Sequence, residues 1–127
     1  MSKIQRFEDL RCWQSARLLV KHAFVVCERG KLSKDYETRA QFKKAALSTM
    51  NNIAEGFGRF HKNDSLRFYD FSQSSALELQ SMTYTLADVG YISEEEAFSL
   101  RTKAEETKNL TLGLVKHINN RNSKSIE

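Results

Sequence analysis

The chain has 127 residues, of which 40% are hydrophobic and 28% charged, and its formal net charge is +4. This length supports one domain with a single core, and no apolar run approaches the roughly 20 residues that a membrane-spanning helix needs. The composition is typical of a soluble protein, and the mild positive charge favours an anionic partner without requiring one.

The start of the chain, Met-Ser-Lys-Ile-Gln-Arg, lacks the apolar segment of a secretory signal, so we expect a cytoplasmic protein with no membrane partner. Cys12 and Cys27 are fifteen residues apart on one predicted helix. That spacing is about 22 Å along a helix axis, which is too far for a disulfide. We expect both thiols to be reduced and in or beside the core.

Four segments repeat apolar residues at three- and four-residue steps, and the chain contains no proline. This pattern predicts an all-α fold. We expect helices over about residues 7–29, 34–56, 64–89 and 94–119, and a flexible polar tail over residues 120–127. Because short connections make successive helices antiparallel, the predicted architecture is an up-and-down four-helix bundle, one domain over residues 1–127.

The apolar stripes also name the expected core. In chain order its members are Trp13, Ala16, Val20, Ala23, Cys27, Phe42, Ala45, Thr49, Ile53, Tyr69, Ser72, Ala76, Leu79, Thr83, Leu86, Ala97, Leu100, Ala104, Thr107, Thr111, Leu114 and Ile118. The stripes are widened by Leu10, Leu19, Phe24, Val26, Ala46, Met50, Leu77, Met82 and Val89.

Residues that favour helix ends lie at the predicted boundaries. Glycines are expected to end three of the helices, namely Gly30, Gly56 with Gly58, and Gly90. The expected N-caps are Ser33, either Asn63 or Asp64, and Ser93, the last of which forms a capping box with Glu96.

Three polar residues lie beside the apolar stripes of the second and third helices: Asn52, Glu55 and Glu78. Inward carboxylates on a bundle can mark a di-metal site, but such a site requires a Glu-x-x-His pattern. Gly58 and Ser81 occupy the positions where those histidines would be. We therefore expect a structural hydrogen-bond network that fixes helix register, with no metal and no cofactor.

No pattern of a catalytic site is found. The cysteines lie within an apolar stripe, the serines lie in no strand-turn-helix elbow, and the Gly56-Phe-Gly58 segment ends a helix instead of opening one. We expect a protein that is not an enzyme and has no catalytic residues.

Basic residues form two groups. Arg39, Lys43 and Lys44 are expected on the outer side of the second helix, and Arg59, Lys62 and Arg67 around the connection to the third, interleaved with Phe57, Phe60 and His61. Cations beside aromatic rings at a turn suit phosphates and unstacked bases. The alternative is a solvated face whose aromatic residues pack the end of the bundle.

Several large apolar residues lie off the main stripes, among them Phe68, Phe71, Tyr84 and Phe98. An apolar stripe on the outside of a bundle predicts subunit contacts. The alternative is that the assignment of helix faces is wrong by one residue.

Four blocks of the sequence resemble a known family. They are Phe7-Glu-Asp-Leu-Arg-Cys-Trp13, Gln41-Phe-Lys-Lys-Ala-Ala46, Ser48-Thr-Met-Asn-Asn-Ile-Ala-Glu-Gly-Phe-Gly-Arg59, and Ser74-Ser-Ala-Leu-Glu-Leu79 with Leu86-Ala-Asp-Val-Gly-Tyr91. Over about residues 7–118 the chain resembles the four-helix bundle proteins encoded in intervening sequences of bacterial 23S rRNA genes. It is similar in the same blocks to a related branch, the accessory variability determinant of diversity-generating retroelements.

The resemblance implies an antiparallel bundle that assembles into a homopentameric ring. It further implies a non-enzymatic accessory protein that binds RNA or DNA through basic surface residues. A second reading is a protein-interaction scaffold, for example one that docks a reverse transcriptase. Asn52, Glu55, Gly56 and Glu78 fall on polar and glycine positions typical of the family, to which we assign structural roles.

Overall fold

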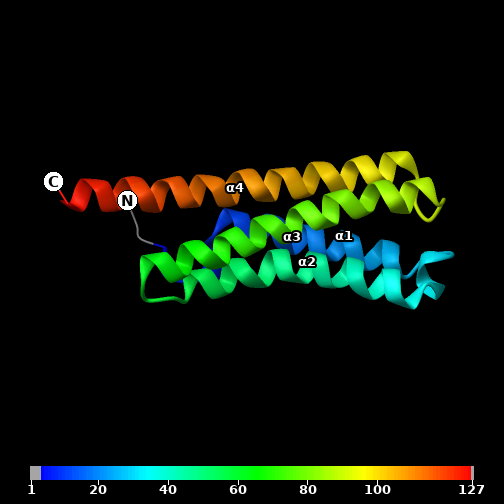
Figure 1. The fold of residues 1–127 in the computed structure, drawn as a ribbon, viewed down its shortest axis with the longest axis horizontal. Helices are drawn as coiled ribbons and strands as arrows, with labels where there is room; N and C mark the ends of the chain where they lie inside the picture. The colour runs from blue at the N-terminus through cyan, green and yellow to red at the C-terminus, as the bar shows by residue number, and fades with distance from the viewer. Residues whose placement is uncertain (1–3, 127) are drawn as a thin grey trace.

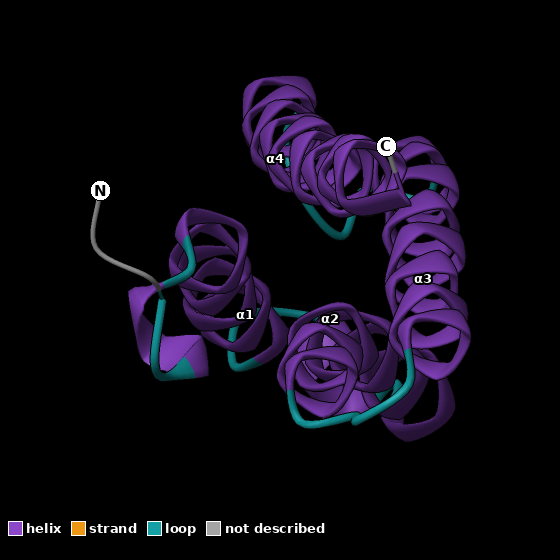
Figure 2. Ribbon diagram, turned by 90° about the vertical axis from the view of Figure 1, so that its left-hand side faces the viewer, coloured by secondary structure: helices purple, strands orange, loops and turns teal. Residues whose placement is uncertain are grey.

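The computed structural model describes the backbone of residues 4–126 and the side chains of residues 4–120. Within this part of the chain every regular element is helical. The long helices are α1 (Arg11–Cys27), α2 (Tyr36–Phe57), α3 (Lys62–Asp88) and α4 (Glu94–Ile126), and the short 3-10 helices are η1 (Phe7–Asp9) and η2 (Leu32–Lys34). Figure 2, an end-on view, shows α1, α2, α3 and α4 in that order around the bundle. The predicted four-helix bundle is confirmed.

The helices run alternately up and down, so the connections gather at two ends (Figure 1). One end holds the α2–α3 connection, and the other holds the α1–α2 and α3–α4 connections. The final turns of α4 project beyond the first of these ends. No described helix is both long and apolar enough to cross a membrane.

Helix α4 is longer than the sequence pattern indicates. Its backbone is helical to Ile126, whereas the apolar stripe predicts an end at residue 119. No glycine or proline follows Gly113, so no residue in this stretch interrupts the helix. The predicted flexibility of the tail stays a prediction, because residue 127 and the side chains after residue 120 lie outside the described residues.

The predicted first helix over residues 7–29 is divided. Leu10 has an extended backbone (φ −71°, ψ 127°) between η1 and α1, and its side chain is buried. Phe7 meets Trp13 edge to face, with ring centroids 5.1 Å apart. The bend at Leu10 thus lets Phe7 and Leu10 pack on the core cluster around Ile53, which a straight helix would not allow.

The glycine ends and the last cap agree with the sequence. Gly30 and Gly90 have φ values of +51° and +79°, in the left-handed region that favours glycine. Ser93 Oγ accepts a hydrogen bond from the Glu96 N–H at 3.1 Å, which caps α4. These positions confirm the predicted boundaries after α1, after α3 and before α4.

Asp35, not Ser33, caps α2. Its carboxylate accepts hydrogen bonds from the backbone N–H of Thr38 at 3.2 Å and from the Thr38 hydroxyl at 2.9 Å. It also accepts one from the Tyr91 hydroxyl at 2.8 Å. Residues 32–34 form η2, which moves the start of α2 beyond Ser33. Asp35 therefore joins the α1–α2 connection, in which it lies, to the α3–α4 connection, which contains Tyr91.

The core follows the predicted stripes closely on α2, α3 and α4, except that Leu114 and Ile118 are half-buried. On α1 the buried set includes Cys12, Leu19 and Val26, while the predicted Trp13 and Val20 are half-buried. Two hydroxyl groups in this core, those of Ser15 and Thr107, contact each other at 2.7 Å. Buried hydroxyls without a partner would destabilise the bundle.

Candidate nucleic-acid interface

The connection between α2 and α3 depends on two glycines that act differently. Gly58 ends α2 with an ordinary negative φ (−80°), and its N–H donates to the Ala54 carbonyl at 3.2 Å. Gly56 lies inside the helix and does not stop it, contrary to the sequence prediction. A Cβ at Gly56 would lie 2.6 Å from Cε1 of Tyr69. Gly56 is thus required because α2 and α3 approach closely just before the turn.

Two arginines gather on the ring of Phe68, in the first turns of α3. The guanidinium carbon of Arg59 lies 4.3 Å from the ring centroid, and that of Arg67 lies 5.9 Å away. Phe71 supports the same ring edge to face, with centroids 5.9 Å apart. A cation–π contact at an exposed site contributes about 0.5–1 kcal/mol. That is enough to favour one side-chain position while the N–H groups remain available to an anion.

Three further exposed residues complete the turn. Phe60 is 94% exposed, and the His61 ring meets it at 89° with centroids 5.1 Å apart. Lys62 is the first residue of α3. The sequence predicted a cap at Asn63 or Asp64, but His61 occupies that position and makes no side-chain capping bond. The positive end of the α3 dipole therefore lies beside these cations without a capping side chain.

We call Arg59, Phe60, Lys62 and Arg67, together with the supporting ring of Phe68, the turn site. None of the ion pairs formed within residues 4–120 includes Arg59, Lys62 or Arg67. Asp64 is the acidic residue of the first turn of α3, and it is half-buried. The turn site therefore combines three cations outside any such ion pair with an exposed ring, a combination suited to phosphates and bases.

The predicted basic patch on α2 is a different kind of feature. Arg39 and Lys43 face α1, where both bind Glu28 Oε1, at 2.8 Å and 3.0 Å. Lys43 also lies 4.7 Å from the Phe24 ring centroid. Hydrogen bonds from Arg39, and next from Lys43, hold the pKa of Glu28 below its ordinary value. Of the predicted outward group, only Lys44 is exposed, so this patch is largely an α1–α2 contact.

The predicted polar network is only partly formed. Asn52 donates to the Ser48 carbonyl at 2.8 Å and to the Ser48 hydroxyl at 2.9 Å, and Ser48 contacts Ser75 of α3 at 2.7 Å. Glu78 is exposed and accepts one bond from Gln41 at 3.2 Å. Glu55 is exposed, and no hydrogen bond joins its side chain to another described residue. Glu55 follows Asn52 by three residues, which places it ~60° farther than Asn52 from the buried stripe around the axis of α2. The prediction that Glu55 points inward is therefore wrong.

The four aromatic residues predicted at a subunit interface form two separate groups. Phe68 is half-buried and Phe71 is 46% exposed, both near the turn site. Tyr84 (57% exposed) lies near the end of α3 and Phe98 (65% exposed) near the start of α4, where the α3–α4 connection is. The Arg101 guanidinium carbon lies 4.1 Å from the Tyr84 ring centroid, and Arg101 follows Phe98 by one helical turn. Tyr84 therefore contacts this arginine, and Phe98 lies one turn before the arginine on the same helix.

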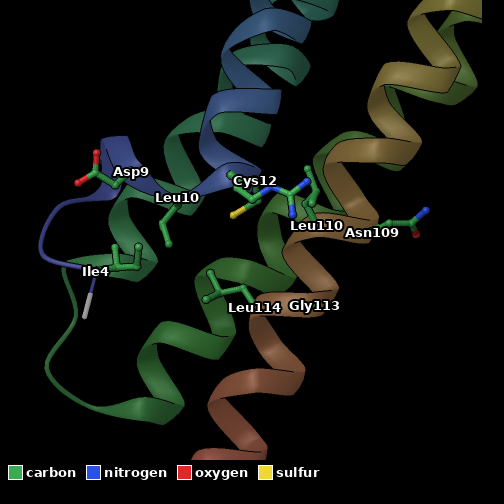
Figure 3. A pocket seen from close by; sticks show the side chains of 9 residues that line it. Ile4, Asp9, Leu10, Cys12, Asn109, Leu110, Gly113 and Leu114 are labelled. Atoms are coloured by element: carbon green, nitrogen blue, oxygen red, sulfur yellow. The ribbon is translucent and has the colours of Figure 1, made fainter. Parts of the chain in front are cut away.

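A groove of about 340 Å³ separates the start of α1 from α4. Its lining includes Ile4, Leu10 and Leu114, while Asp9 and Asn109 point outward on opposite sides (Figure 3). The groove is thus mainly apolar. Within residues 4–120 no three His, Cys, Asp or Glu side chains are placed to share a metal ion.

The two cysteines lie in the core. Burial raises the pKa of the Cys12 thiol and of the Cys27 thiol, so neither has the lowered pKa of an activated nucleophile.

Residues 8–113 match the family described as 23S rRNA-intervening sequence protein. This chain belongs to that family. The matched range includes α1, α2, α3, the first part of α4 and every residue of the turn site. The resemblance to the 23S rRNA intervening-sequence proteins is therefore confirmed.

A solved structure supports the fold of this chain. It is the crystal structure, at 1.70 Å resolution, of a protein of unknown function from the S23 ribosomal protein family of Bacteroides thetaiotaomicron VPI-5482. The TM-score is 0.74 at 16% identity, over 83% of this chain and 98% of that one. No curated protein matches the sequence. At this identity the likeness establishes the shared fold alone.

Sequence reasoning missed several contacts of the intervening-sequence protein. It placed Phe68 at an interface and did not find its role under Arg59 and Arg67. The signal was present, because Phe68 follows Arg67 directly. The contact between Arg101 and Tyr84, like that between Asp35 and Tyr91, joins separate elements and has no local signal.

Proposed function

We propose that this intervening-sequence protein binds nucleic acid through the turn site, as a non-enzymatic accessory protein. The observation that carries the proposal is that Arg59 and Arg67 both lie on the Phe68 ring, close in sequence to Lys62 and the exposed Phe60, with no ion pair from these cations to any described acidic residue. A phosphate chain supplies the anions that this surface lacks. Guanidinium groups bind phosphate oxygens through two parallel N–H donors.

The basic residues on α2 and those of the turn site differ in whether an ion pair must break before they can bind a phosphate. Arg39 and Lys43 would have to leave Glu28, their partner at 2.8 Å and 3.0 Å, before binding a phosphate. The cations of the turn site have no such partner within residues 4–120 and would displace only water and counterions. Three phosphate contacts correspond to a log–log salt slope of about −2 for a single strand and about −3 for a duplex.

The test is the affinity of the purified protein for labelled structured RNA and duplex DNA over a salt series. The double variant Arg59→Ala/Arg67→Ala should weaken binding and reduce the slope by about 1.4 for single-stranded segments. Lys31→Ala/Lys34→Ala removes the same charge at the opposite end of the bundle and should leave the slope unchanged. Absence of binding by the wild type at low salt, or equal slopes for both variants, would refute the proposal.

We further infer that the protein acts as a homo-oligomer, with the pentamer implied by the family resemblance as the expected state. Two exposed rings near Arg101 support an intersubunit contact: Tyr84, which contacts Arg101, and Phe98, one helical turn before it. Tyr84→Ala should lower the solution mass without unfolding the subunit, and Phe71→Ala tests the second exposed group. Tyr36, which is 72% exposed at the start of α2, provides the matched control Tyr36→Ala.

The alternative function is a protein-interaction scaffold, with a reverse transcriptase as one possible partner. The same exposed pair, Tyr84 and Phe98, is the observation that favours it. A monomeric wild-type mass would leave these rings uncovered in solution and would support the scaffold. An oligomer that Tyr84→Ala dissociates would assign the surface to subunit contacts.

A further inference from the structure

We propose that the turn site selects unpaired bases, and that Phe60 is the residue on which a base stacks. This inference rests on the proposed function, because it assumes that the neighbouring cations bind phosphates. Phe60 is the most exposed large hydrophobic side chain among the described residues, at 94%. This exposure leaves the ring accessible to a base, as stacking requires.

The position of Phe60 is not explained by packing. Phe57, three residues earlier, is half-buried against the core cluster around Ile53. Phe60 lies just past the end of α2, in the connection, and belongs to neither core cluster. Leaving a ring of this size in water forgoes a favourable burial, so a ligand that covers it gains that contribution on binding.

The surroundings of Phe60 select the chemistry of that ligand. Arg59 precedes it, and His61 and Lys62 follow it. An apolar protein surface placed on Phe60 would desolvate these polar groups without pairing them, which is unfavourable. A nucleotide offers a flat ring for Phe60 and an anionic phosphate for Arg59 or Lys62. One ligand then satisfies both kinds of side chain.

The support beneath the site adds to this selectivity. Arg59 lies on the Phe68 ring at 4.3 Å, and Phe71 holds that ring edge to face. The arginine is thereby held on the bundle, while its neighbour Phe60 projects into solvent. In a duplex each base face is covered by the next base pair, so only the phosphates can be contacted. In a single strand or a loop the bases are free to stack on an aromatic side chain.

The expected effect follows from the usual strength of stacking. Loss of one base–aromatic stack weakens single-strand binding about 5- to 150-fold. Phe60→Ala should therefore weaken binding to a single-stranded oligonucleotide by a factor in this range and leave binding to a duplex of the same sequence unchanged. Phe60→Tyr keeps a ring and should restore most of the affinity. Tyr36→Ala, an exposed aromatic residue at the other end, should change neither.

The experiment compares three labelled DNA probes of one length at one low salt concentration: a single strand, its duplex, and a strand with abasic sites. Wild type should bind the abasic strand as weakly as Phe60→Ala binds the normal strand, and Phe60→Ala should not distinguish the two strands. An RNA strand of the same sequence serves as a fourth probe, because stacking does not require the 2′-hydroxyl.

Each outcome has a separate meaning. If the wild type binds single strand, duplex and abasic strand equally, with the salt dependence given above, phosphate binding stands and the base-stacking inference is wrong. If Phe60→Ala loses equal affinity for the single strand and for the duplex, the base-stacking inference is wrong as well. If the wild type binds none of the probes, the proposed function fails and this inference fails with it.

Discussion

The close approach of α2 and α3 gives the sharpest test of the fold. A methyl group added at Gly56 would lie 2.6, 2.9 and 3.0 Å from three carbons of the Tyr69 ring. That ring is 2% exposed, so it cannot turn away into solvent. Overpacking of this kind destabilises a protein by about 1–3 kcal/mol. Replacing a helical glycine with alanine offsets part of this loss, because it stabilises the helix by about 0.5–1 kcal/mol. Because three ring atoms are crowded, we expect Gly56→Ala to be destabilised by about 1–2 kcal/mol.

Urea unfolding followed by circular dichroism, at one protein concentration, measures this difference. Gly58→Ala is the matched control, because its Cβ would meet only the carbonyl oxygens of Glu55 at 3.7 Å and Ala54 at 3.8 Å, which are ordinary contacts. We expect Gly58→Ala to unfold within about 0.5 kcal/mol of wild type. In thermal unfolding a loss of 1 kcal/mol should lower Tm by about 3–6 °C for a chain of this size.

A double-mutant cycle assigns the cost to the ring. In a Tyr69→Ala background the space beside Gly56 is open, so Gly56→Ala should be neutral or stabilising there. The reasoning is refuted if Gly56→Ala is as stable as wild type, if Gly58→Ala is the less stable variant, or if the two changes at Gly56 and Tyr69 are additive.

Other residues give further tests. Glu55→Ala should leave thermal stability unchanged or slightly raised, since Glu55 is exposed near the carboxyl end of α2; a clear drop in Tm would show that it has a partner. Hydrogen bonds from Tyr91 and from Thr38 lower the pKa of Asp35, so the unfolded chain takes up this proton first and wild-type stability falls as the pH drops below about 4. Asp35→Asn should reduce that pH dependence. If the free energy of unfolding falls with pH equally in both proteins, the role given to Asp35 is wrong. Both buried thiols should react with a thiol reagent only in urea, and fast native reaction would show that α1 opens.

The fold was largely predictable because its signal is local. Tyr69, Ala76 and Leu79 follow three- and four-residue steps and are all buried. The first helix was less predictable, since its break depends on Leu10 packing against distant residues. The last helix was underestimated because the polar residues after 119 carry no apolar stripe, although their backbone continues as a helix.

The candidate site was predictable where its residues are neighbours in sequence. Arg59, Phe60 and Lys62 lie within four positions of one another. The prediction of an outward basic patch on α2 was wrong because its partner, Glu28, precedes Arg39 by eleven positions and Lys43 by fifteen, just past the end of α1. A local pattern shows a cation but does not show which distant carboxylate neutralises it.

The packing contact and the turn site are linked through consecutive residues of α3. Tyr69 faces Gly56 in the interior, and Phe68, one residue earlier, carries Arg59 at the surface. A methyl group at Gly56 that pushes α2 from α3 should therefore separate Arg59 from its ring without removing any charge. The salt slope counts phosphate contacts, whereas affinity also includes the cost of ordering side chains. A folded Gly56→Ala protein should then bind more weakly with an unchanged slope, while Arg59→Ala should reduce the slope and lose no more stability than the cation–π contact contributes, about 0.5–1 kcal/mol.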